Sequence, residues 1–184
     1  TANSGYIAAD LLSQAEHGPD SQVLLVTTSA KLAPEVMKAI ETQTLALPRK
    51  QIVEGALQHS KVIIVKDIQE AVAIVNAYAP EHLIISCVND EAVAEKIVNA
   101  GSVFLGNYSP ESAGDYASGT NHTLPTNGYA RAYSGVSVDS FVKKITYQKL
   151  TRGGLSGIAP VIIRMAEAEG LEAHANAVRV RMGK

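Results

Sequence analysis

Short apolar runs alternate with amphipathic stretches along the first two thirds of the chain. Four runs rich in β-branched and other large apolar residues predict buried strands, at residues 22–29, 61–66, 82–87 and 102–106. Between them, apolar positions recur at helical spacing and predict helices at residues 5–16, 30–44, 49–58, 67–79 and 90–100. This alternation is typical of βαβ units, so we expect an α/β fold with an incomplete doubly wound (Rossmann-like) parallel sheet covered on both faces.

The pattern changes after residue 126. Residues 128–141 are rich in turn formers, residues 145–151 (ITYQKLT) predict a short strand, and residues 157–178 predict helix interrupted at Gly170. The segment TRGGLSG before this helix predicts a helix start, with Ser156 as its cap. Such a tail is too small to hold its own core and must pack on the α/β domain or on another subunit. We therefore predict a Rossmann-like domain at residues 1–136 and a mainly helical C-terminal tail at 137–184; the family resemblance given below implies that this tail lies in a dimer interface.

Composition narrows the class of protein. The 184 residues can bury a substantial core, and the formal net charge of −2 gives no reason to expect a nucleic-acid or membrane-surface partner. No apolar run is long enough to span a membrane, and there is no signal peptide. The single cysteine, Cys87, excludes an internal disulfide and favours a cytoplasmic location; its place at the end of an apolar run favours a buried structural thiol. The chain lacks an initiator methionine and opens on helical pattern, so we expect it to be part of a larger protein.

Polar residues that can carry chemistry gather in a long loop predicted at residues 113–126, after the fourth strand. Asp115 and His122 lie there among glycines, at the carboxyl end of a strand, where α/β sheets bind their ligands. A loop of this length inside a compact domain is usually functional or disordered. For this pair the functional interpretation is favoured over the structural one.

Three other polar groups favour a structural interpretation when taken alone, although a functional one stays open for each. Gln14 and His17 lie three residues apart at a helix end, so they share one face and can bind a metal ion, or merely form a polar helix end. Glu81 and His82 precede a strand and offer two proton carriers, or two solvated residues after a helix-stopping proline. The third group is Glu169 and His174, near Gly170, which interrupts the last helix. These two residues can be ligands, or they can form a solvent-facing helix end.

Pooling the ligand candidates gives two nitrogens and two oxygens without sulfur, from Gln14, His17, Asp115 and His174. A mixed set of this kind fits a catalytic Zn²⁺ or Mn²⁺ site with positions open for substrate. The chain contains neither a GxGxxG dinucleotide fingerprint nor a lysine-containing P-loop.

Four motifs, in this order, closely resemble the carboxyl-terminal part of the histidinol dehydrogenase family: SQAEHGPDSQ, YAPEHL, AGSVFLGNYSPESAGDYASGTNHTLPT and EGLEAHANAV. The resemblance covers essentially the whole chain and implies a zinc- and NAD-dependent oxidation of L-histidinol, through the aldehyde, to L-histidine, the last steps of histidine biosynthesis. It implies a homodimer, and an NAD-binding half that lies upstream of this chain. The isolated chain is therefore expected to be inactive.

The resemblance also implies residue roles. The zinc ligands would be Gln14, His17, Asp115 and His174, the last donated by the partner subunit. Glu81 and His82 match the catalytic pair: His82 would accept the alcohol proton and Glu81 would activate the water that hydrates the aldehyde. The substrate-binding set comprises Gln14, His17, His82, Asp115, His122, Glu169 and His174. Two other classes stay open as alternatives, a metal-dependent hydrolase that uses Glu81 or His82 and a non-catalytic metal-binding or dimerisation module.

Overall fold

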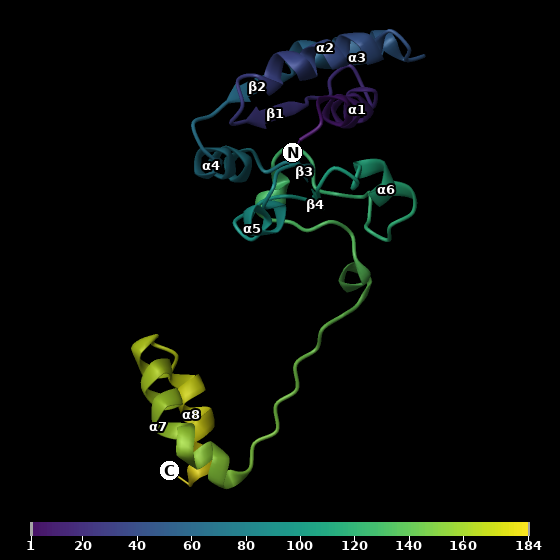
Figure 1. Cartoon of the computed structure of the whole chain (residues 1–184). Coiled ribbons are helices and arrows are strands. Elements are labelled where there is room, and N and C mark those ends of the chain that lie inside the picture. The colour runs from purple at the N-terminus through teal and green to yellow at the C-terminus, as the bar shows by residue number, and fades with distance from the viewer. Residues whose placement is uncertain (1, 184) are drawn as a thin grey trace. The chain divides into compact units, whose positions relative to one another are not determined.

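The chain forms two compact units in its computed structural model, which describes residues 2–183. The first unit comprises Thr1–Phe141 and the second Val142–Lys184 (Figure 1). The first carries all four strands, and the second carries the last two α-helices.

The first half of the larger unit is built on one pair of parallel strands. Its elements are α1 (Ser4–Ala15), β1 (Leu24–Thr27), α2 (Leu32–Thr44), α3 (Lys50–His59) and β2 (Lys61–Ile64). The register runs from Leu24 opposite Lys61 to Thr27 opposite Ile64. Helix α1 begins where the sequence offers a cap, because the Asn3 side chain accepts hydrogen bonds from the next free backbone amides.

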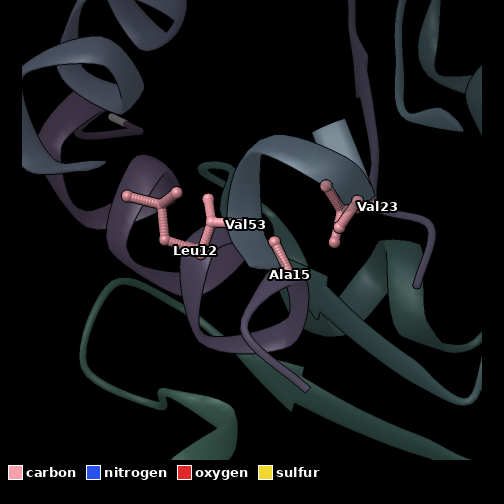
Figure 2. Close-up of a cluster of buried hydrophobic side chains, with 5 residues drawn as sticks. Leu12, Ala15, Val23 and Val53 are labelled. Carbon is pink, nitrogen blue, oxygen red and sulfur yellow. The ribbon is translucent and has the colours of Figure 1, made fainter. Parts of the chain in front are cut away.

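A buried apolar cluster joins α1, α3 and the residue before β1. Figure 2 shows Leu12 and Ala15 of α1 close to Val53 of α3 and to Val23, and Ala56 completes the cluster. The two helices contribute their residues at a spacing of three, which places each pair on one helix face. This packing fixes the carboxyl-terminal end of α1, where Gln14 lies.

The second half of the larger unit holds another parallel pair. Its elements are α4 (Ile68–Tyr78), β3 (His82–Ile85), α5 (Asp90–Ala94), β4 (Ser102–Leu105) and α6 (Glu111–Tyr116), followed by two 3-10 turns, Tyr129–Arg131 and Val138–Phe141. In register, His82 lies opposite Ser102 and Ile85 opposite Leu105. The fold is therefore mixed α/β with small parallel sheets: within residues 2–183 the strands form two separate pairs instead of one four-stranded sheet.

Burial of the strands is less complete than their sequences predict. On β2, Val62 is 40% exposed and Ile64 54% exposed, so the expectation of a sheet covered on both faces is wrong there. Cys87, expected to be buried, is a half-buried free thiol after β3. An apolar run rich in β-branched residues identifies a strand, but it does not show which helix or segment packs on each face of that strand.

Two helical boundaries in this unit also differ from the prediction. Helix α5 ends at Ala94 instead of residue 100. The segment predicted as loop from residue 113 begins inside α6, so Asp115 lies on a helix. Pro110 precedes the first turn of α6 and Glu111 opens it, which is a common helix start, whereas Gly114 and the polar residues around it favoured a loop.

The second unit is a helical hairpin that follows an extended segment. Its helices are α7 (Arg152–Ala168) and α8 (Glu172–Arg179), and the 3-10 turn Val180–Met182 follows. The predicted strand at 145–151 is wrong, because no residue of this segment pairs in a sheet. Thr151, not Ser156, caps α7 by accepting a hydrogen bond from the Gly154 amide.

The turn of the hairpin and one arginine hold α7 against α8. Gly170 adopts φ +72°, a left-handed conformation that reverses the chain after α7. Arg179 of α8 forms ion pairs with Glu167 of α7 and with Glu172. None of the helices described between residues 2 and 183 is long and apolar enough to cross a membrane.

Candidate active site

Helix α6 packs on one face of the β3–β4 pair, and this contact creates the site. His82 and Phe104 lie on the same sheet face because the strands pair in parallel with His82 opposite Ser102. Their rings are stacked, with centroids 6.2 Å apart and planes inclined by 30°. Gly114 of α6 comes so close to this face that a Cβ atom there would lie 2.7 Å from the Phe104 ring and 2.7 Å from the Thr120 hydroxyl oxygen.

Replacing Gly114 by alanine should therefore lift α6 from the sheet. Overpacking of this kind costs about 1–3 kcal/mol of unfolding free energy, and the displaced helix carries Asp115. We expect Gly114→Ala to lower the unfolding free energy measured in urea. If that free energy equals the value of the unaltered protein, α6 does not depend on this close approach.

The segment before β3 is held by backbone hydrogen bonds from the start of β4. The Gly101 amide donates to the Pro80 carbonyl at 2.9 Å, and the Ser102 amide donates to the Glu81 carbonyl at 2.9 Å. These bonds fix the backbone of Glu81 and hence the adjacent His82. Both side chains are half-buried, so each stays accessible from the site while its backbone is fixed.

A buried carboxyl group, Glu111 at the start of α6, lies against three elements. Glu111 is 3% exposed. One carboxyl oxygen, Oε1, lies 3.9 Å from His82 Nε2, and the other, Oε2, accepts a 3.5 Å hydrogen bond from the Ser13 hydroxyl of α1. Asp115 follows one turn later on α6 and its side chain hydrogen-bonds to Glu111. Candidate ligand atoms of His82, Glu111 and Asp115 all lie within 4.8 Å of one another.

The electrostatics of this group follow from its burial. Burial, together with the hydrogen bond and the charge of Asp115, raises the pKa of Glu111 to about 7, while the Ser13 and Gln14 side chains oppose the shift. Burial also lowers the pKa of His82, and the neighbouring His17 adds to this, against the opposing effect of Glu81 and Asp115. His82 is therefore a neutral imidazole at pH 7, able to accept a proton.

Two buried nitrogens in this region have no hydrogen-bond partner among the described residues: Gln14 Nε2 and His82 Nε2. An unpaired buried polar group costs about 1–3 kcal/mol, so native structures seldom keep one without a reason. Here both side chains lie beside Glu111. The arrangement suits a site that completes its polar contacts by binding a ligand.

The structure brings together most of the residues singled out in the sequence. Gln14 lies in the last turn of α1, His82 at the start of β3 and Asp115 on α6. His17 is exposed and lies beyond the end of α1 at Ala15, so it does not share a helix face with Gln14 as expected. His17, Glu81 and Asp115 act electrostatically on His82. His122 lies in the exposed segment after α6. The last two candidates lie in the second unit and are exposed: Glu169 at the end of α7 and His174 on α8. Their part in the site stays a prediction.

Sequence reasoning missed Glu111. The signal was present, because Glu111 and Asp115 are four residues apart and share a helix face when the segment is helical. With residues from 113 on assigned to a loop, that spacing carried no meaning.

Comparison with known proteins places the chain among enzymes of one kind. The family model described as histidinol dehydrogenase matches residues 1–182. A histidinol dehydrogenase of Bacteroides thetaiotaomicron is 60% identical over 99% of this chain and 42% of its own length. That of Vibrio cholerae is 54% identical over 100% of this chain and 43% of its own length.

A solved structure agrees with these sequence matches. The crystal structure of histidinol dehydrogenase from Elizabethkingia anophelis matches with a TM-score of 0.94 and 58% identity, over 100% of this chain and 42% of that chain. The chain thus spans about two fifths of the length of the relatives it matches. Since one family model covers nearly every residue, the chain belongs to the histidinol dehydrogenase family.

Proposed function

We propose that this chain supplies the zinc-binding, substrate-binding and proton-transfer residues of an NAD-dependent histidinol dehydrogenase. The enzyme would oxidise L-histidinol to L-histidine through L-histidinal, the last steps of histidine biosynthesis, in the cytoplasm. The observation that carries the proposal is the cluster around the buried Glu111: His82 Nε2 lies 3.9 Å from its Oε1, Gln14 and Asp115 interact with it, and His17 and Asp115 act electrostatically on His82. Residues from three separate motifs of the family match thus act on one another.

The donor set fits zinc. Gln14 offers an amide oxygen, His17 an imidazole nitrogen and Asp115 a carboxylate oxygen, all ligands that zinc accepts in catalytic sites. When bound, zinc would supply positive charge that orients the nitrogen atoms of the substrate.

Proton transfer falls to Glu81 and His82. His82 has a lowered pKa and an unpaired Nε2 atom, so it can accept the hydroxyl proton as the first hydride leaves the alcohol carbon. Glu81 would then take a proton from the water that adds to the aldehyde. In the second oxidation His82 accepts the hydroxyl proton of the hydrate. NAD⁺, when bound, accepts the hydride of each oxidation.

The remaining roles involve the exposed candidates and the rest of the protein. His122 and Glu169 would contact the substrate, and His174 would complete the metal ligands from the partner subunit of a homodimer. The tail at 137–184 would lie in that dimer interface. The domain at 1–136 would form part of a Rossmann-like, doubly wound sheet, and the NAD site would lie mostly outside this chain. Residues 1–184 alone are accordingly expected to form negligible NADH.

Calorimetric titration of L-histidinol tests this assignment. In the full-length protein we expect binding that requires Zn²⁺ and that is lost in His17→Ala. His59→Ala, an exposed histidine at the end of α3, serves as the matched control and should bind as tightly as the unaltered protein. Binding that is independent of zinc, or unchanged in His17→Ala, would contradict the proposal. Formation of NADH from histidinol and NAD⁺ by the same protein distinguishes a dehydrogenase from a hydrolase, which would form none.

A further inference from the structure

Glu111 is the only charged residue that is buried in the described part of the chain. A carboxyl group loses much hydration when it is buried, and it is retained in such a place only with suitable partners. It accepts a hydrogen bond from Ser13 of α1, and its other neighbours are Gln14 of α1, His82 of β3 and Asp115 of its own helix. These are the elements that carry the proposed zinc ligands and the proposed base.

The two carboxyl oxygens of Glu111 face different neighbours. Oε2 lies 3.5 Å from the Ser13 hydroxyl, beside Gln14, and Oε1 lies 3.9 Å from His82 Nε2. Asp115, one turn later, hydrogen-bonds to the same group. A side chain placed in this way links α1, β3 and α6 through a single buried contact.

We propose that Glu111 is a positioning residue, which holds Gln14, Asp115 and His82 in the arrangement that zinc and substrate require. This inference rests on the proposed function and adds to it a group outside the ligand set. It acts through its neighbours: it fixes the ligand residues on α1 and α6 and limits the orientation of the His82 ring. Groups that orient metal ligands typically affect metal affinity or activity by about 10- to 100-fold when removed.

Direct ligation by Glu111 is the competing interpretation, since His82, Glu111 and Asp115 could together approach an ion. Replacement by glutamine separates the two roles. In Glu111→Gln the side chain keeps its shape, an oxygen that can accept from Ser13 and an amide that can donate to Asp115. A positioning role therefore survives this change, whereas a carboxylate ligand loses its negative charge.

The test measures zinc affinity by competition with a chelator, together with kcat and KM, in the full-length protein. We expect Glu111→Ala to weaken zinc binding by about 10- to 100-fold and to lower kcat by a similar factor, and Glu111→Gln to restore both to within about threefold of the unaltered protein. Glu111→Asp retains the carboxyl group, but the side chain is shorter by one methylene group, so the carboxyl group lies farther from its neighbours. It should weaken zinc binding about tenfold, the lower end of the range above, and it serves as the second test if the alanine variant does not fold.

The control separates positioning from general loss of stability. Replacing the buried Val65, which follows β2, by alanine removes buried apolar volume away from the site at a cost of about 1–3 kcal/mol. The folded Val65→Ala protein should bind zinc normally.

Each other outcome has a definite meaning. Unchanged zinc affinity and kcat in Glu111→Ala and Glu111→Asp would overturn the positioning role. A glutamine variant as impaired as the alanine variant would overturn it in favour of ligation. If the unaltered protein binds no zinc, the proposed function itself fails, and the inference fails with it.

Discussion

Replacing His82 by glutamine in the full-length protein is expected to lower kcat for histidinol oxidation by about 10²–10⁴-fold, the usual contribution of a general base. The reason lies in the environment of the imidazole: burial keeps His82 neutral, and its Nε2 atom is unpaired among the described residues. Glutamine can occupy the same space but cannot accept the proton. Steady-state NADH formation at saturating histidinol measures the loss.

Zinc content and substrate affinity distinguish the loss of a base from a folding defect, because a folding defect would lower both. The His82→Gln protein should retain its zinc, because Gln14, His17 and Asp115 are unaltered, and its histidinol binding should change far less than kcat. Glu81→Gln should impair the oxidation of L-histidinal more than the oxidation of L-histidinol, since Glu81 is assigned to the water. Turnover of His82→Gln within about threefold of the unaltered protein would exclude His82 as the base.

Local pattern predicted the elements of this fold better than their assembly. The four strands of the described residues lie where β-branched runs indicate, and helices α1 to α4 follow the apolar periodicity, whereas α5 is shorter than predicted and α6 was missed. The division into two strand pairs was not predicted, because pairing depends on contacts between distant segments that periodicity does not encode. The residues at 145–151 show the same limit: they have strand propensity, but they are exposed and have no strand to pair with.

Residue type alone favoured a functional role only for Asp115 and His122. Gln14, His17, Glu81 and His82 were singled out through the family motifs, and the structure places Gln14 and Asp115 beside Glu111, with His17, Glu81 and Asp115 acting on His82. Glu111 was missed because its meaning depends on α6 being a helix that packs on Phe104. That contact requires Gly114, a residue whose local signal favours a loop.

Gly101→Ala is expected to destabilise the larger unit and to lower activity together. A Cβ atom at residue 101 would lie 2.5 Å from the Glu81 backbone oxygen and 3.3 Å from Leu124 Cβ. The backbone oxygen cannot move aside as a flexible side chain would, because it accepts the 2.9 Å hydrogen bond from the Ser102 amide. Relief therefore requires β3 to shift against β4, at an expected cost of about 1–3 kcal/mol or more in unfolding free energy.

Such a shift would displace His82, the residue after Glu81 and the first of β3. The predicted signature is therefore a lower midpoint of urea unfolding together with a reduced kcat in the protein that remains folded. Gly157→Ala in α7 is the matched control, because a Cβ atom there meets nothing within 4 Å and alanine is favoured over glycine in helices by about 1 kcal/mol. It should leave stability unchanged or increased. A Gly101→Ala protein with unaltered midpoint and kcat would show that the close approach of residues 81 and 101 does not hold the catalytic segment in place.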